Sequence, residues 1–276
     1  MADYQGKVAV ITGGANGIGR ELAKSCAAKG MKIAVADIDA PNLASLEAEL
    51  KAQGADIFAA AFDVRSLEDM EAFAKKAFAT YGTVDLFFNN AGVAVVGNIW
   101  SMDMKDWKWG FETNVMGLVH GIKSFIPTML EQDKEARIIN TASIAGMLIS
   151  PNSPVYVSSK HAAVALTEVL NMQLQIAGSK IKAHVYCPGF ILTDLHNSNR
   201  HRPDELVSDP SDPYYKSEDF TSKTQIMTES VLGGIPVNEA IELVWKAIEE
   251  EKFFILTHPQ YKPMVEGRMQ AIMASW

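Results

Sequence analysis

The segment Lys7–Arg20, KVAVITGGANGIGR, constrains the fold more than any other part of the chain. Its apolar, β-branched first half predicts a buried strand, and the helix-favouring residues at its end predict a helix. Between them lies a tight turn that contains Gly13, Gly14, Gly17 and Gly19. A helix that begins in such a turn presents unpaired backbone N–H groups and the positive end of its dipole, so it can bind a diphosphate without a basic side chain.

An acidic residue at a suitable distance supports this interpretation. Asp37 ends the next apolar run, Lys32–Ala36, and lies 24 residues after Gly13. In dinucleotide-binding folds a carboxylate roughly 20 residues beyond the phosphate turn binds the ribose hydroxyls. The alternative for Asp37 is the solvated end of a strand.

Composition limits the class of partner and the compartment. The 276 residues suffice for one domain, and the net charge of −8 with scattered lysines and arginines argues against nucleic acid or an anionic membrane. A small-molecule substrate fits better. Cys26 and Cys187 do not form a disulfide framework, so we expect both to be reduced core residues. No signal peptide and no membrane span is predicted, which leads us to expect a cytoplasmic protein.

Short apolar runs alternate with segments of helical periodicity along the chain. The expected strands are Val8–Ile11, Lys32–Ala36, Ile57–Phe62, Val84–Phe88, Arg137–Thr141, Ile181–Tyr186 and Phe253–Leu256. The expected helices after the first are Leu43–Gln53, Leu67–Thr80, Trp107–Glu131, Val155–Ile176 and Val237–Glu250. This alternation predicts an α/β protein with a single doubly wound Rossmann domain over residues 1–276. It would have a seven-stranded parallel sheet with helices on both faces.

Polar and glycine-containing motifs follow the predicted strands. They are Asp63-Val64, Asn89–Gly92, Ser143 and Pro188-Gly189. Each alone is consistent with an ordinary turn. Because ligands bind beyond the carboxyl ends of the strands in such sheets, their shared location indicates a site.

The segment Phe190–Pro236 departs from the βα rhythm. It is rich in Pro, Gly, Ser and Asp, and a connection of this length usually covers a functional site. We therefore expect a substrate lid over residues 190–236, after the sixth strand, with a disordered insertion as the alternative. Its apolar residues could fold over a pocket: Leu206, Tyr214, Tyr215, Phe220, Ile226, Met227, Val231 and Leu232.

Tyr156 and Lys160 are four residues apart, so both side chains would emerge on one face of a helix. Free tyrosine has a pKa of about 10, and a nearby ammonium group favours the phenolate that could act as a base. Ser143 could hydrogen-bond the same substrate oxygen. Alone, this pair is more typical of an ordinary surface helix, so the interpretation depends on the other motifs.

Taken together, these motifs resemble those of the short-chain dehydrogenase/reductase family. The likeness covers Lys7–Thr193: T-G-x-x-x-G-x-G begins at Thr12, N-N-A-G begins at Asn89, and P-G-x-x-x-T spans Pro188–Thr193. The resemblance implies the catalytic residues Asn114, Ser143, Tyr156 and Lys160, with Asn114 distorting its helix as part of a proton relay. It implies cofactor contacts at Gly13, Asn16, Gly17, Ile18, Gly19, Asp37, Asp63, Val64, Asn90, Ala91, Gly92, Tyr156, Lys160, Pro188, Gly189, Ile191 and Thr193.

The expected cofactor is NAD, because Asp37 would repel the 2′-phosphate of NADP. The positions where NADP-dependent members of the family carry a basic residue hold Asn16 and Ile38. Arg20 is nearby, but the carboxylate is the stronger discriminator. The resemblance implies hydride transfer between NAD(H) and a secondary alcohol or ketone. An NAD-binding regulator without turnover and an epimerase or dehydratase are the alternatives.

The substrate is expected to be bulky and apolar, and the tail from Phe253 resembles a subgroup of the family, which implies a substrate such as a hydroxysteroid, bile acid or aryl alcohol. The residues expected around the reacting carbon are Val95, Val96, Ile144, Met147, Leu148, Ile149, Val155, Phe190, Ile191 and Leu192. No metal site is expected, since the histidines lack ligand spacing. The resemblance implies a homo-oligomer, tetramer or dimer, that pairs Trp107–Glu131 and Val155–Ile176. In the tail, 258–276, apolar residues at helical spacing predict a helix buried against either the lid or a neighbouring subunit.

Overall fold

The computed structural model describes residues 3–276 and contains one seven-stranded sheet in the order β3-β2-β1-β4-β5-β6-β7. All neighbouring strands are parallel. The strands are β1 Val8–Thr12, β2 Lys32–Asp37, β3 Ile57–Ala61, β4 Leu86–Asn89, β5 Ala136–Thr141, β6 Ile181–Cys187 and β7 Phe254–Leu256. Strand order reverses between β1 and β4, and ligands of such sheets bind beyond that point. The predicted doubly wound fold is confirmed.

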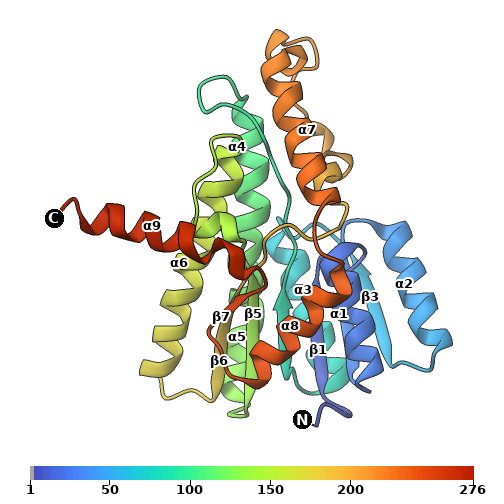
Figure 1. Ribbon diagram of the computed structural model, residues 1–276. Helices are drawn as coiled ribbons and strands as arrows, with labels where there is room; N and C mark the ends of the chain where they lie inside the picture. The colour runs from blue at the N-terminus through green and yellow to red at the C-terminus, as the bar shows by residue number, and fades with distance from the viewer. Residues whose placement is uncertain (1–2) are drawn as a thin grey trace.

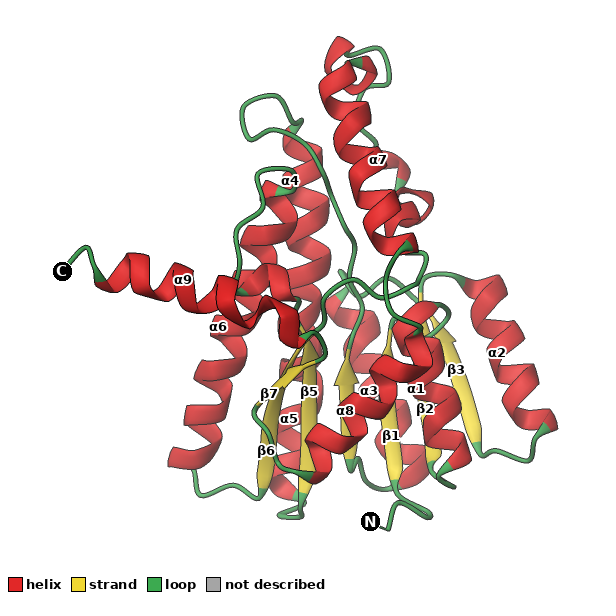
Figure 2. Cartoon of the chain, viewed as in Figure 1, coloured by secondary structure: helices red, strands yellow, loops and turns green. Residues whose placement is uncertain are grey.

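Helices cover both faces of the sheet (Figures 1 and 2). They are α1 Gly17–Ala28, α2 Ala40–Ala52, α3 Leu67–Tyr81, α4 Met104–Phe111, α5 Gly117–Glu131, α6 Pro154–Ile176, α7 Glu218–Leu232, α8 Val237–Glu249 and α9 Lys262–Met273. One core contains Leu22 of α1 and Ile248 of α8, and the other contains Phe73 of α3 and Phe125 of α5. Strands β1 and β4 are buried along their whole length because side chains from both of their faces pack into these cores, whereas the edge strands β3 and β7 are partly exposed.

Two expected helices have different bounds in the structure. Helix α2 begins at Ala40 rather than Leu43, because the Asp39 carboxylate accepts a hydrogen bond from the Asn42 N–H and caps the helix. The expected helix Trp107–Glu131 is divided into α4 and α5 by a π-helical turn at Glu112–Met116. Such turns inside an α-helix are frequent at functional sites.

The insertion after β6 is folded, so the disordered alternative is wrong. It contains short 3₁₀ segments and α7, which rises above the carboxyl end of the sheet (Figure 1). The two ends of the insertion are joined where Ile191 and Ile235 form a parallel bridge. Of its apolar residues, Leu206 and Val231 are buried, whereas Ile226 and Leu232 are exposed.

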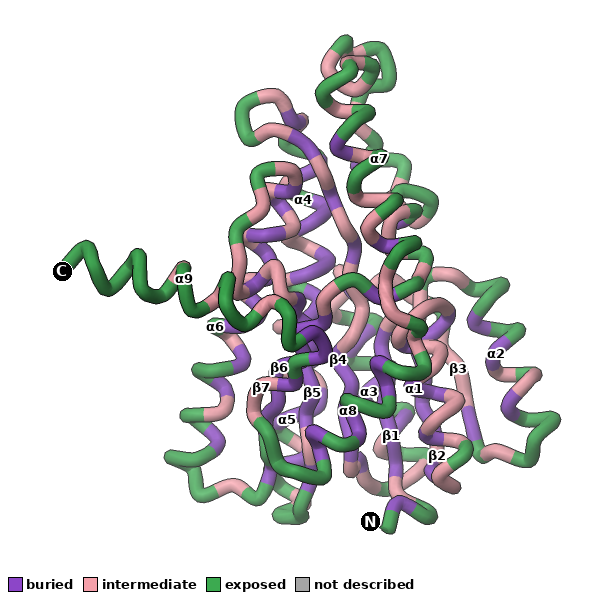
Figure 3. The backbone as a smooth tube through the Cα atoms, viewed as in Figure 1, coloured by how far each residue is buried: buried purple, intermediate pink, exposed green. Residues whose placement is uncertain are grey.

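The tail helix α9 projects away from the body of the chain, and Figure 3 shows it exposed beside the buried strands. Met264, Met269 and Trp276 are all exposed. The expected burial of this stripe against the lid is wrong, because α9 leaves the edge strand β7 in a direction away from α7 (Figure 1). Cys26 and Cys187 are buried free thiols, as predicted. Within residues 3–276, no helix is both long and apolar enough to cross a bilayer.

Candidate active site

A cavity at the carboxyl ends of the strands gathers nearly all of the expected site residues. Its lining includes Gly13, Asn16, Gly17, Ile18, Asp37, Asp63, Val64, Asn90, Ala91, Gly92, Ser143, Tyr156, Lys160, Pro188, Gly189, Ile191 and Thr193. Two expected residues, Gly19 and Asn114, lie behind this lining. Segments separated by up to about 180 residues of sequence therefore meet at one site because parallel strands end at the same edge of the sheet.

The glycine-rich turn forms one end of the cavity. Gly13 and Gly17 have φ values of +67° and +51°, which favour glycine. A side chain at Gly19 would place its Cβ 2.0 Å from the carbonyl oxygen of Gly13, and one at Gly17 would lie 3.1 Å from Thr193, across the cavity. The first turn of α1 contains no acidic residue and no side-chain cap, so its N–H groups are available to an anion. The turn therefore fits a diphosphate.

Asp37 lies at the end of β2 with its carboxylate fixed by two backbone donors. The N–H groups of Ala15 and Asp39 donate to it at 2.8 and 2.9 Å. Arg20 is not part of the cavity lining, and its guanidinium pairs with Glu49 at 2.6 Å. Asp37 is therefore a fixed anionic group at this end of the cavity. The Arg20 guanidinium is paired with Glu49 and not with Asp37.

Asn90 ties the ends of three strands together. Its side-chain amide donates to the carbonyl of Thr12 at 3.1 Å and accepts from the hydroxyl of Thr141 at 3.1 Å. Its own N–H donates to the Thr12 hydroxyl. These contacts hold β1, β4 and β5 in register at the cavity floor, where the Thr141 carbonyl faces Lys160.

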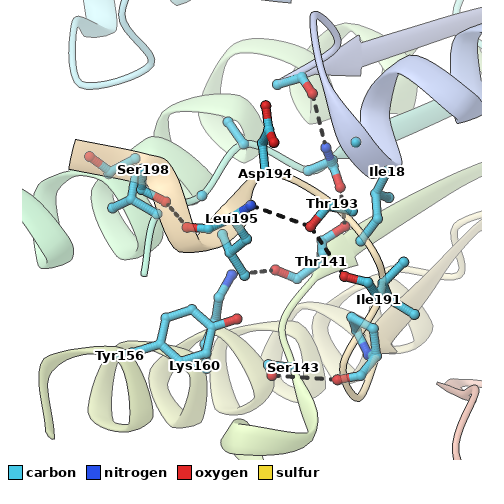
Figure 4. Close-up of a pocket in the computed structure, with 18 of the residues that line it drawn as sticks. Ile18, Thr141, Ser143, Tyr156, Lys160, Ile191, Thr193, Asp194, Leu195 and Ser198 are labelled. Atoms are coloured by element: carbon cyan, nitrogen blue, oxygen red, sulfur yellow. Dashed lines mark hydrogen bonds between the residues drawn. The ribbon is translucent and has the colours of Figure 1, made fainter. Parts of the chain in front are cut away.

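Ser143, Tyr156 and Lys160 lie together in the cavity, as Figure 4 shows. The Lys160 ammonium donates to the carbonyl of Thr141 at 3.0 Å and lies 5.6 Å from the centre of the Tyr156 ring. The Ser143 hydroxyl accepts from the N–H of Ala145 at 3.1 Å, but its own donor contact, to Pro188, is long at 3.5 Å. A bond of that length is weak, so the hydroxyl proton can be redirected to a ligand.

Burial dominates the electrostatics of this group. It lowers the pKa of Lys160 to about 8. It raises the pKa of Tyr156 above its usual value, although the neighbouring Ser143 side chain lowers it in part. The expectation that Lys160 brings the pKa of Tyr156 below the usual value is therefore not met in the chain alone, because desolvation outweighs the other contributions.

Asn114 lies in the π-helical turn between α4 and α5, where it is buried. Its side-chain oxygen accepts from the N–H of Val93 at 2.8 Å, and its amide donates to the Val93 carbonyl and to the hydroxyl of Ser159. A Cβ at Gly92 would lie 3.2 Å from both Asn114 Oδ1 and Lys160 Nζ. Asn114 and Lys160 therefore both lie next to Gly92, which lines the cavity.

The residues expected around the reacting carbon differ from those that line the cavity. Of the ten residues expected around the reacting carbon, only Ile144, Phe190 and Ile191 are among those that line it. Val95 and Val155 pack into a core behind the wall, and Ile149 is exposed. The side chains that take their place come from α4, the loop before α6, and the insertion: Trp109, Ser153, Leu195, Met227 and Val231. No local sequence signal marked Trp109, because an aromatic residue in an apolar helix is typical of a core.

Family and sequence comparisons agree with this geometry. The family model described as short chain dehydrogenase matches residues 7–204. A CLA biosynthesis dehydrogenase/reductase of Lactiplantibacillus plantarum is 39% identical over 273 residues, covering 99% of this chain and 95% of the relative. A 1-deoxy-11-beta-hydroxypentalenate dehydrogenase of Streptomyces exfoliatus is 31% identical over 256 residues, covering 92% of this chain and 84% of the relative.

A solved structure is similar over the whole chain. It is a short chain dehydrogenase/reductase from Burkholderia phymatum in complex with NAD, with a TM-score of 0.96 and 37% sequence identity. The match covers 100% of this chain and 97% of that one. The similarity therefore includes the insertion and the tail as well as the sheet.

Proposed function

The chain belongs to the short-chain dehydrogenase family, and from that premise we propose that it transfers a hydride between NAD(H) and an apolar secondary alcohol or its ketone. The observation that carries the proposal is the placement of Ser143, Tyr156 and Lys160 in the same cavity as the glycine turn. Intact catalytic positions argue against an NAD-binding regulator without turnover.

NAD fits the cavity better than NADP. The carboxylate of Asp37 is held by two N–H donors, so it is fixed where the ribose hydroxyls would bind. A 2′-phosphate there would meet a like charge, and Arg20 is engaged with Glu49 instead of facing the cavity. The relative from Burkholderia phymatum was solved with NAD. Gly13, Gly17 and the start of α1 would hold the diphosphate.

Three side chains would carry the proton chemistry of alcohol oxidation. Tyr156, as phenolate, takes the hydroxyl proton of the alcohol, and Ser143 donates a hydrogen bond to the same oxygen as it becomes a carbonyl. Lys160 stabilises the phenolate by its charge and is itself held by the Thr141 carbonyl. When bound, NAD⁺ accepts the hydride from the carbinol carbon. In ketone reduction, Tyr156 returns the proton.

An uncharged, apolar substrate is supported by the lining of the cavity. The lining includes the uncharged apolar side chains of Trp109, Phe190, Leu195, Met227 and Val231. Two relatives are named as dehydrogenases: the CLA biosynthesis dehydrogenase/reductase and the 1-deoxy-11-beta-hydroxypentalenate dehydrogenase. We propose residues 190–236 as the lid of a single domain, since Leu195 and Met227 of that segment face the cavity.

A homo-oligomer belongs to the same proposal. Helices α5 and α6 expose apolar side chains in the single chain, and the equivalent helices pair between subunits in the family. On α6, Val169 is 50%, Met172 61% and Ile176 84% exposed. Such a surface is better buried against a second copy than left in water.

Cofactor reduction with a panel of alcohols tests the proposal. The panel should contain hydroxysteroids, bile acids, aryl carbinols and aliphatic secondary alcohols, each tried with NAD and NADP and followed by absorbance of the reduced cofactor. We expect turnover with apolar members and with NAD. The proposed function fails if no alcohol or ketone is turned over by protein that binds NADH.

A further inference from the structure

His258, which follows β7, lies against the turn Pro188-Gly189-Phe190 that forms one side of the cavity. The imidazole is 8% exposed. Its Nδ1 accepts a hydrogen bond from the N–H of Gly189 at 3.1 Å, and its Nε2 lies 3.1 Å from the carbonyl oxygen of Phe190. A Cβ at Gly189 would come within 2.6 Å of the ring, so only glycine allows this approach.

These contacts define the form of the ring. The Gly189 N–H needs an unprotonated Nδ1 as its acceptor, and the Phe190 carbonyl needs a proton on Nε2. The neutral Nε2–H tautomer satisfies both at once. In the imidazolium, Nδ1 carries a proton that faces the Gly189 N–H, and the Thr257 hydroxyl, 2.8 Å from Nδ1, is the acceptor left to it. Protonation thus deprives Gly189 of its partner.

The turn that His258 holds is connected to the rest of the site. The carbonyl of Pro188 accepts from the N–H of Ile144 at 2.8 Å, next to Ser143. The carbonyl of Phe190 also accepts from the N–H of Ile235 at 3.1 Å, at the base of the insertion. A shift of the turn therefore reaches both the catalytic serine and the base of the proposed lid.

We propose that neutral His258 is a positioning residue that fixes the Pro188–Phe190 turn for cofactor binding, and that its protonation weakens binding as pH falls. This inference depends on the proposed function, because it needs a cofactor that touches the turn. Burial lowers the pKa of His258, while its bond to Phe190 raises it in part, so burial favours the neutral ring. Tyr261 is a titratable side chain packed beside it, and its ring centre lies 5.9 Å away.

The test is the dissociation constant of NADH, measured by fluorescence between pH 7.5 and pH 5. If only the neutral form is competent, each pH unit below the pKa raises the Kd of the wild type by up to about tenfold. His258→Asn offers an acceptor near the position of Nδ1 and does not titrate. We expect it to bind NADH at pH 7.5 within a few-fold of wild type and to lack the rise at low pH.

Two further variants make the comparison specific. His258→Leu removes both contacts and should raise the Kd at every pH. His184→Asn is the matched control, because His184 is also buried, but its hydrogen bond is to the carbonyl of Lys252 and not to the Pro188–Phe190 turn. It should keep the wild-type rise. Near-UV circular dichroism at each pH shows whether each variant is folded.

The outcomes separate the two proposals. A wild type that binds no NADH at any pH overturns the proposed function. A wild type whose Kd is flat from pH 7.5 to pH 5, or a folded His258→Asn variant that keeps the full rise, overturns the role of His258.

Discussion

The insertion is fastened to α4 by a buried ion pair, and breaking it should cost a measurable part of the stability. Arg202 lies 2.5 Å from Asp106, with their side chains 9% and 4% exposed. The guanidinium also lies over the ring of Trp109, 4.3 Å from its centre. The carboxylate further accepts from Tyr215 and from Ser208.

The Arg202→Met substitution leaves the Asp106 carboxylate buried without its cation. Removing one partner of a buried pair costs about 3–5 kcal/mol. Since the hydrogen bonds from Tyr215 and Ser208 remain, we expect the lower end, about 3 kcal/mol. At roughly 2–4 °C per kcal/mol for a chain of this size, the melting temperature should fall by about 6–12 °C.

Scanning calorimetry and urea unfolding measure this effect, with two comparisons. Glu205→Gln breaks the exposed pair between Arg65 and Glu205, also between the insertion and the core, and should cost no more than about 1 kcal/mol. The double variant Asp106→Leu with Arg202→Met removes both charges and should recover part of the loss. The reasoning is refuted if Arg202→Met destabilises no more than Glu205→Gln does.

Three further predictions concern cofactor choice, pH and the tail. Replacing Asp37 by Ser removes the charge facing the ribose, so the NAD-to-NADP ratio of kcat/KM should fall by about tenfold or more; an unchanged ratio contradicts this. Because burial raises the pKa of Tyr156, alcohol oxidation, which needs the phenolate, should accelerate with rising pH until Lys160 loses its proton near pH 8. Ketone reduction should show the opposite slope, and parallel slopes would count against Tyr156 as the acid–base group. Deleting residues 262–276 removes an exposed apolar helix. If a neighbouring subunit covers this helix, light scattering should show a smaller oligomer after the deletion. An unchanged oligomer size and melting temperature would show that the tail contributes to neither assembly nor stability.

Local sequence was sufficient to predict those features of the fold and the site that depend on a single strand, turn or helix. The central strands were predicted because their apolar runs are buried on both faces. The meeting of Gly13, Gly17 and Asp37 at one cavity was predicted because parallel strands end at the same edge of the sheet. Helical spacing predicted that Tyr156 and Lys160 lie on one face, but only the other motifs of the family indicated a catalytic pair.

Non-local contacts explain what the sequence did not reveal. Trp109, which lines the cavity, is in contact with the guanidinium of Arg202. Arg202 lies 93 residues further along the chain, in the insertion. The role of His258 depends on a turn that lies 69 residues before it. The exposed stripe of α9 carries the apolar spacing of a buried helix, but spacing does not indicate which surface covers it.

The most direct test of the proposed function separates hydride transfer from cofactor binding in one variant. Tyr156→Phe removes a single hydroxyl and leaves the glycine turn and Lys160 in place. With an alcohol that wild type oxidises, single-turnover formation of NADH should fall by at least about a hundredfold in Tyr156→Phe, while the Kd for NADH stays within a few-fold of wild type. A variant that binds NADH normally and still forms it at more than a few per cent of the wild-type rate would contradict Tyr156 as the proton acceptor.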